Sequence, residues 1–180
     1  MTDKEKLDLF SFELSAIQNE TIRGEVKHLL LRTPDYFWQI PASSTGKYHP
    51  KFSLGNGGLI RHTKVACYFA IQMLNLDMWQ SIRNDSDIII GALILHDCCK
   101  TGGEKYTRFD HPILAAKFIE DNCISIDIAF KLCELIKTHM GQWNTDTRTK
   151  QTLPNPQTAQ QKFVHLCDYL ASRKEVDFNF

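Results

Sequence analysis

The run Ile88–Leu95 holds only apolar residues and a glycine, and the polar pair His96 and Asp97 follows it directly. A run of this composition predicts a helix that is buried on all sides. That helix would carry an imidazole and a carboxylate into the interior, where an unpaired charge is costly. A group of opposite charge must therefore meet the pair, and this requirement constrains the fold more than any other feature of the chain.

Four further imidazole and carboxylate residues are expected at helix ends or on apolar helix faces: His62, His111, His139 and Asp168. Imidazole and carboxylate ligands together suit zinc, manganese, iron or nickel. A structural zinc normally uses only four ligands and often includes cysteine. Six ligand residues, with one carboxylate free to bridge, instead fit two ions about 3.5–4 Å apart. We therefore predict a site for two divalent transition-metal ions (Mn, Fe, Zn or Ni).

Apolar residues recur at helical spacing through most of the chain, and no segment alternates with a period of two. These patterns predict an all-α fold. Turn-forming residues in 35–58 predict a long ordered loop of the kind that often covers a binding site, and the polar segment 141–156 predicts a second loop. Helices are expected around residues 7–17 and 22–32, from residue 58 with His62 on the first turn, over 86–98, from 111, around 128–139, and over 157–174.

The composition is that of one globular domain spanning residues 1–180, with N-terminal helices and a loop (1–56) and a metal-binding helical core (57–174). The 21 basic and 21 acidic residues balance, so net charge does not favour nucleic acid or membrane as a partner. The N-terminus lacks the apolar region of a signal peptide, and no apolar run is long enough to span a membrane. The six cysteines form no Cys-x-x-Cys pair, which favours buried thiols in a reducing compartment. We expect a cytoplasmic protein.

The ordered series His … His-Asp … His … His … Asp resembles the HD-domain superfamily of metal-dependent phosphohydrolases. The resemblance runs from about Gly57 to Asp168 and implies a helical HD-domain bundle. It is carried by three segments: Gly-Gly-Leu-Ile-Arg-His-Thr (57–63), Leu-His-Asp-Cys-Cys-Lys (95–100) and Thr-His-Met-Gly (138–141).

The resemblance also implies roles for the six ligand candidates. It assigns His62, His96, Asp97 and Asp168 to one ion, with Asp97 bridging to a second ion that His111 and His139 hold. Many HD domains that bind one metal lack these two later histidines. Because this chain has both histidines, it resembles the two-metal branch of the family. That branch includes cyclic-dinucleotide phosphodiesterases, CRISPR-associated HD nucleases and certain exoribonucleases.

The predicted catalytic residues are Asp97 and Lys100. In the implied mechanism the two ions activate a water that attacks phosphorus. Lys100 matches the family's His-Asp-x-x-Lys pattern, and its ammonium can pair with a phosphoryl oxygen in the transition state. The chain departs from the family at Cys99, where glycine is usual.

Three residues are candidates for contacting the substrate, each beside a structural alternative. Arg61 can bind a phosphate or form a surface salt bridge. His49 can reach over the site from the long loop or be an ordinary turn histidine before proline. Trp143 can offer a stacking wall for a base or pack in a core or interface.

Two more polar residues have structural interpretations. His165 lies one turn before Asp168 on the expected helix, where it can orient that carboxylate or fill a buried structural position. Asp110 precedes the helix that begins at His111-Pro112, and we expect it to cap that helix.

We predict a metal-dependent phosphohydrolase that cleaves a phosphoester of a nucleotide, cyclic nucleotide or oligonucleotide. Its partner would be a small phosphorylated substrate, with no membrane and no stable nucleic-acid partner. One alternative is an HD-type di-iron oxygenase, because the same ligands can hold two irons. Another is a regulatory or binding module with a vestigial site, although unliganded buried carboxylates and imidazoles would then need other partners.

Overall fold

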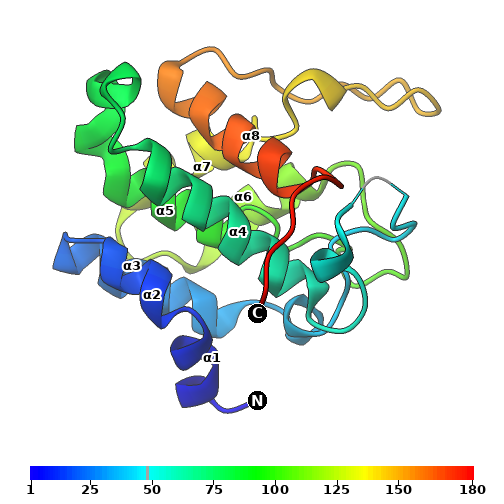
Figure 1. Ribbon diagram of the computed structural model, residues 1–180, viewed down its shortest axis with the longest axis horizontal. Coiled ribbons are helices and arrows are strands. Elements are labelled where there is room, and N and C mark those ends of the chain that lie inside the picture. The colour runs from blue at the N-terminus through cyan, green and yellow to red at the C-terminus, as the bar shows by residue number, and fades with distance from the viewer. Residues whose placement is uncertain (48) are drawn as a thin grey trace.

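The computed structural model describes residues 1–47 and 49–180, and within them the fold is all-α, as predicted (Figure 1). The β-pairing in this part of the chain is the isolated bridge between Thr145 and Thr152. None of the helices described is both long and apolar enough to cross a membrane. The α-helices are α1 (Asp3–Leu9), α2 (Ser11–Ala16), α3 (Glu20–Arg32), α4 (Gly58–Met73), α5 (Ser86–Leu95), α6 (His111–Asn122), α7 (Ile126–Ile136) and α8 (Ala159–Ala171).

Helix α5 forms the centre of the bundle, as its uniformly apolar sequence predicts. It packs against α3, α4, α7 and α8, and every residue from Ile88 to Leu95 is buried. A Cβ added at Gly91 would lie 2.8 Å from Cγ2 of Val26 in α3, so the absence of a side chain lets these two helices approach closely. Figure 1 shows α4 and α5 running side by side through the middle of the molecule.

The N-terminal region is more broken than its periodicity predicts. Phe10, with φ −106° and ψ 16°, separates α1 from α2, so the expected helix over 7–17 is two short ones. The break places the Phe10 ring against Phe37 and Trp38, with ring centroids 6.5 and 6.1 Å away. Burial of three aromatic rings in one cluster outweighs the local gain from a continuous helix.

The long loop predicted over 35–58 contains two 3-10 helices, η1 (Asp35–Trp38) and η2 (Lys51–Ser53). η1 delivers Phe37 and Trp38 to the core, so this loop is part of the packed structure. Two further 3-10 helices, η3 (Asp77–Asp85) between α4 and α5 and η4 (Gly141–Trp143) after α7, lie where no element was expected.

Helix α5 ends at Leu95, three residues before the predicted end at Cys98. Beyond it the backbone tightens into i to i+3 hydrogen bonds, from the Cys98 N–H to the Leu95 carbonyl (3.1 Å) and from the Lys100 N–H to the Asp97 carbonyl (3.0 Å). His96 and Asp97 therefore lie on a turn that follows the buried helix.

The predicted cap at the start of α6 is wrong. Asp110 occupies the N-cap position, but its side chain makes no capping hydrogen bond. Both carboxylate oxygens instead accept hydrogen bonds from Arg108, at 2.8 and 2.7 Å. A bidentate charge-assisted pair is stronger than a bond to a neutral backbone N–H, which accounts for the choice. Pro112 does stand in the first turn of α6, as expected.

Candidate metal centre

The structure brings together all six predicted ligand residues, from five different parts of the chain. His62 lies in α4, Asp168 in α8 and His111 at the start of α6, while His96 with Asp97 and His139 follow the ends of α5 and α7. The four histidines and Asp97 are at most 1% exposed. Their ligand atoms form two neighbouring groups that could each hold an ion: His62, His96 and Asp168, and Asp97, His111 and His139.

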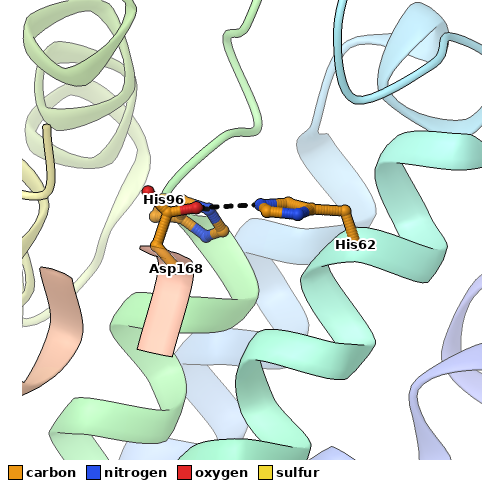
Figure 2. A group of neighbouring side chains, drawn as sticks. All are labelled: His62, His96 and Asp168. Carbon is orange, nitrogen blue, oxygen red and sulfur yellow. Dashed lines mark hydrogen bonds and ion pairs between the residues drawn. The ribbon is translucent and has the colours of Figure 1, made fainter. Parts of the chain in front are cut away.

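The first group joins α4, α8 and the turn after α5 (Figure 2). Asp168 Oδ1 lies 2.9 Å from His62 Nε2 and 3.5 Å from His96 Nε2. In Figure 2 the three side chains converge from separate segments of the fold. Helices hold His62 and Asp168 rigidly, and a metal site requires such rigidity of its nearest ligands.

The second group lies on the other side of Asp97. Its Oδ1 is 3.0 Å from His111 Nε2 and 3.6 Å from His139 Nε2. The two imidazole Nε2 atoms are themselves 3.0 Å apart. All three residues are buried, so water cannot easily supply partners for them.

Asp97 contacts both groups through different oxygens. While Oδ1 faces His111 and His139, Oδ2 lies 3.4 Å from His96 Nε2 and 3.9 Å from His62 Nε2. A carboxylate that presents one oxygen to each of two ligand groups has the geometry of a bridging ligand.

The backbone fixes how these imidazoles are protonated. Nδ1 of His96, His111 and His139 lies 2.7, 2.6 and 2.8 Å from the carbonyl oxygens of Leu93, Arg108 and Ile136. A carbonyl only accepts, so each Nδ1 carries a hydrogen, and a ring in its neutral form has its lone pair at Nε2.

The positions of the ring hydrogens indicate whether a metal ion fits the site. Two neutral rings at His111 and His139 would direct lone pairs at each other across 3.0 Å, an arrangement that needs a cation or a proton between them. Among the described residues, His96 Nε2 and Asp97 Oδ1 are also buried without a hydrogen-bond partner. Imidazole nitrogens and carboxylate oxygens without other partners are the ligand atoms that divalent transition metals prefer. The residues present therefore fit the predicted metal ions.

His96 and His111, one from each group, have pKa values shifted in opposite directions. Burial acts to lower the pKa of His96, but the carboxylates of Asp97 and Asp168 outweigh it and raise that pKa to about 10. Burial and the nearby Lys100 ammonium instead lower the pKa of His111 to about 4. Burial opposes ionisation of Asp97, yet Lys100 and His96 hold the pKa of that carboxyl well below its usual range. His96 thus carries a proton that an ion would replace.

Two glycines allow α4 to begin where it positions His62. Gly57 adopts the left-handed conformation, with φ +70°. A Cβ on Gly58 would lie 2.2 Å from the backbone oxygen of Ser53, so η2 can approach the helix start only because Gly58 has no side chain.

Arg61 is turned to the backbone and forms no salt bridge among the described residues, while its contact with a substrate phosphate stays a prediction. Its guanidinium donates to the backbone carbonyls of Phe52, Leu54 (2.9 Å) and Asn56 (3.0 Å). These carbonyls belong to the segment that precedes α4. Arg61 therefore fastens the end of the long loop to the helix that carries His62.

A cavity of about 600 Å³ opens beside the ligand groups and is lined by both His111 and Asp168. Its rim combines the loop 42–45 with the segment after α5, joined by hydrogen bonds between Ser44 and Thr107 at 2.8 and 2.9 Å. Lys100 also lines it, with Nζ 2.7 Å from Asp97 Oδ2. The volume is in the range of small-molecule sites.

His49 lies over the centre, as one of its two interpretations predicts. It lines the cavity, and its ring centroid is 5.8 Å from that of His62. Its Nδ1 is buried and has no hydrogen-bond partner among the described residues. Burial, with His62 and Lys100 nearby, lowers the pKa of His49 to about 4, so the ring is neutral near pH 7.

Trp143 lines the same cavity from η4 and is 45% exposed. Its ring stacks on Tyr169 with centroids 5.4 Å apart and planes 17° from parallel. Tyr169 and Arg173 also line the cavity, and sequence analysis missed both. Their places in the sequence could have indicated this: Tyr169 directly follows the ligand Asp168, and Arg173 lies two residues beyond the end of α8.

Among the described interactions, the His165 ring bonds to the backbone and makes no hydrogen bond or ion pair with Asp168, the residue that one interpretation had it orient. Its Nδ1 lies 2.7 Å from the backbone oxygen of His139. A Cβ on Gly141 would lie 2.2 Å from the His165 ring, and Gly141 has φ +55°. His165 therefore packs under the turn that carries His139, which is the structural alternative.

Comparison with known proteins gives one match. A family model described as HD domain matches residues 59–173, a range that includes all six ligand residues. No curated protein and no solved structure matches the chain.

Proposed function

The chain belongs to the HD-domain family, and from this we propose that it is a metal-dependent phosphohydrolase that cleaves a phosphoester of a nucleotide, cyclic nucleotide or oligonucleotide. The observation that carries the proposal is the double contact of Asp97. One oxygen faces His111 and His139, and the other faces His96 and His62. A shared carboxylate between two imidazole groups suits two ions that act on one phosphoryl group.

Two divalent transition-metal ions would be held by the two ligand groups. His62, His96 and Asp168 would hold one, His111 and His139 the other, and Asp97 would bridge them. Bound there, the ions would act as Lewis acids that polarise the phosphoryl group and acidify water. The carbonyls behind His96, His111 and His139 take the Nδ1 hydrogens, so that Nε2 of each ring is the atom that would coordinate.

Side chains around the cavity would bind the substrate. Lys100 presents an ammonium next to Asp97, where it can pair with a phosphoryl oxygen as negative charge develops. His49 carries a buried ring nitrogen without a partner that can hydrogen-bond to a substrate oxygen. Trp143 offers an exposed aromatic face on which a nucleobase can stack. These three contacts favour a nucleotide-like substrate over a simple sugar phosphate.

The test is to purify the protein, measure its bound metals, and assay phosphoester hydrolysis with added manganese. Substrates would include bis(p-nitrophenyl) phosphate, mononucleotides, cyclic dinucleotides, and short RNA and DNA. We expect metal-dependent release of phosphate or of a shorter nucleotide, and no release with the Asp97→Asn variant.

Two results would contradict the proposal. Iron-dependent dioxygen consumption without phosphoester hydrolysis would make the protein an oxygenase. If the protein bound no divalent metal and hydrolysed no phosphoester, the remaining alternative would be a regulatory or binding module with a vestigial site.

A further inference from the structure

Arg173 lies on the wall of the metal-site cavity, beyond the end of α8. Its guanidinium carbon is 4.1 Å from the centroid of the Tyr169 ring and 5.8 Å from that of Trp143. Tyr169 and Trp143 are stacked on each other, so the three side chains form one continuous surface. We call this surface, made of Trp143, Tyr169 and Arg173, the aromatic–arginine shelf.

The guanidinium is held in place by neutral acceptors. Its Nε donates to the Tyr169 carbonyl at 3.2 Å, and one terminal nitrogen donates to the Ser172 hydroxyl at 2.8 Å. A guanidinium has five N–H donors, so these two bonds leave donors over for a ligand. None of the carboxylates in the described residues forms an ion pair with Arg173.

The other charged groups of the cavity have partners within the ligand groups. The Lys100 ammonium is paired with Asp97 at 2.7 Å, and the Asp168 carboxylate faces His62 at 2.9 Å. Among the lining residues Asp168 is the one carboxylate, and the loop 42–45 adds the hydroxyls of Ser43 and Thr45 to the lining. The cavity therefore has at Arg173 a cation that forms no ion pair with a described carboxylate.

We propose that Arg173 is a second phosphate-binding subsite, which takes a non-reacting phosphate while the nucleobase stacks on Trp143. This inference rests on the proposed function and narrows its substrate class to nucleotides with at least two phosphate groups. A planar guanidinium suits bidentate recognition of phosphate, and its packing on Tyr169 preorganises it for that contact.

A purely structural role for Arg173 makes a different prediction. A cation near a helix C-terminus stabilises the helix dipole, and a cation over aromatic rings stabilises their packing. In that case its replacement would lower thermal stability and leave discrimination between ligands unchanged. The two roles are separated by comparing two ligands that differ by one phosphate.

The experiment compares thymidine 5′-monophosphate with thymidine 3′,5′-bisphosphate on the manganese-loaded protein. Dissociation constants are measured by calorimetry, and the recovered ligand is analysed for hydrolysis. If the ligand is cleaved, KM replaces the dissociation constant. Hydrolysis of the recovered ligand reports the proposed activity, and the ratio of the two affinities reports the phosphate subsite. The variants are Arg173→Gln, Arg173→Lys, and Lys174→Gln as a control that removes the neighbouring exposed cation.

Wild type and Lys174→Gln should prefer the bisphosphate by about tenfold, the effect of one charge-assisted contact. Arg173→Gln should lose most of this preference, and Arg173→Lys should keep part of it because the charge remains. An equal preference in wild type and Arg173→Gln would overturn the proposal, as would a wild type that does not prefer the bisphosphate. Should Arg173→Gln fail to fold, Arg173→Lys must still show a reduced preference.

Discussion

Lys100 Nζ lies 2.7 Å from Asp97 Oδ2, the oxygen that also faces His96 and His62. The i to i+3 turn after α5 brings the two side chains together, since the Lys100 N–H also bonds to the Asp97 carbonyl. The lysine side chain is 12% exposed and lines the cavity. The ammonium therefore lies beside the carboxylate that faces both ligand groups, on the wall of the cavity.

Replacement of Lys100 by alanine should slow turnover by about 10²–10³ while both ions stay bound, because a preorganised charge at a developing oxyanion has an effect of that size. Lys105→Ala, on the exposed segment beyond the turn, is the control. The measurements are kcat and metal content. A Lys100→Ala variant with the wild-type kcat would contradict the catalytic role of Lys100 but not the assignment of the metal ligands.

Replacement of Asp97 by alanine should abolish activity and sharply lower metal content, because both ligand groups lose their shared carboxylate. The fold should survive in weakened form, since the remaining histidines can still hold one ion. Elemental analysis and far-UV circular dichroism check the two parts of this prediction. An Asp97→Ala protein that keeps two ions and full activity would remove Asp97 from the centre of the site.

His111→Ala and His62→Ala should each empty a different ligand group. In both variants occupancy should fall from about two ions toward one, because a group that loses one of its few ligands binds weakly. Anomalous diffraction from the two variants should show the remaining ion on opposite sides of Asp97. A single ion at the same position in both would contradict the assignment of two groups.

Metal binding to the first group should release a proton near pH 7. With a pKa of about 10, His96 is protonated there and must lose its proton to coordinate, whereas His111, with a pKa of about 4, is already neutral. Affinity at the first group should therefore rise about tenfold per pH unit below the pKa of His96.

Calorimetric titration in buffers of different ionisation enthalpy measures this release. His111→Ala isolates the first group and should release about one proton per ion, by the same linkage. A heat that does not depend on the buffer would show that His96 is neutral before the ion binds.

Gly58→Ala should destabilise the protein by about 1–3 kcal/mol, because the new Cβ would overlap the Ser53 backbone. Gly24→Ala is the matched control in an exposed helix position with nothing within 4 Å of the added Cβ. It should stabilise α3 by about 0.5–1 kcal/mol. Urea unfolding of both variants checks the prediction, and equal effects of the two changes would contradict the role given to Gly58.

Helical periodicity was enough to predict the all-α fold and the central, buried α5, because one uniformly apolar segment has few alternatives to the core. It was not enough to predict where helices end. Phe10 interrupts the first helix to join Phe37 and Trp38, and α5 stops at Leu95 to form the turn of His96 and Asp97. Helix ends depend on tertiary partners that a local pattern does not contain.

Residue type and order alone indicated the six metal-ligand candidates, since buried imidazoles and carboxylates need cations wherever the fold places them. Contacts between distant segments decided the rest. The two oxygens of Asp97 face separate groups only because α4, α6, α7 and α8 meet at the end of α5. Arg61 turned to loop carbonyls and Arg173 to the cavity for the same reason: a long cationic side chain binds whichever acceptors the folded chain brings within reach.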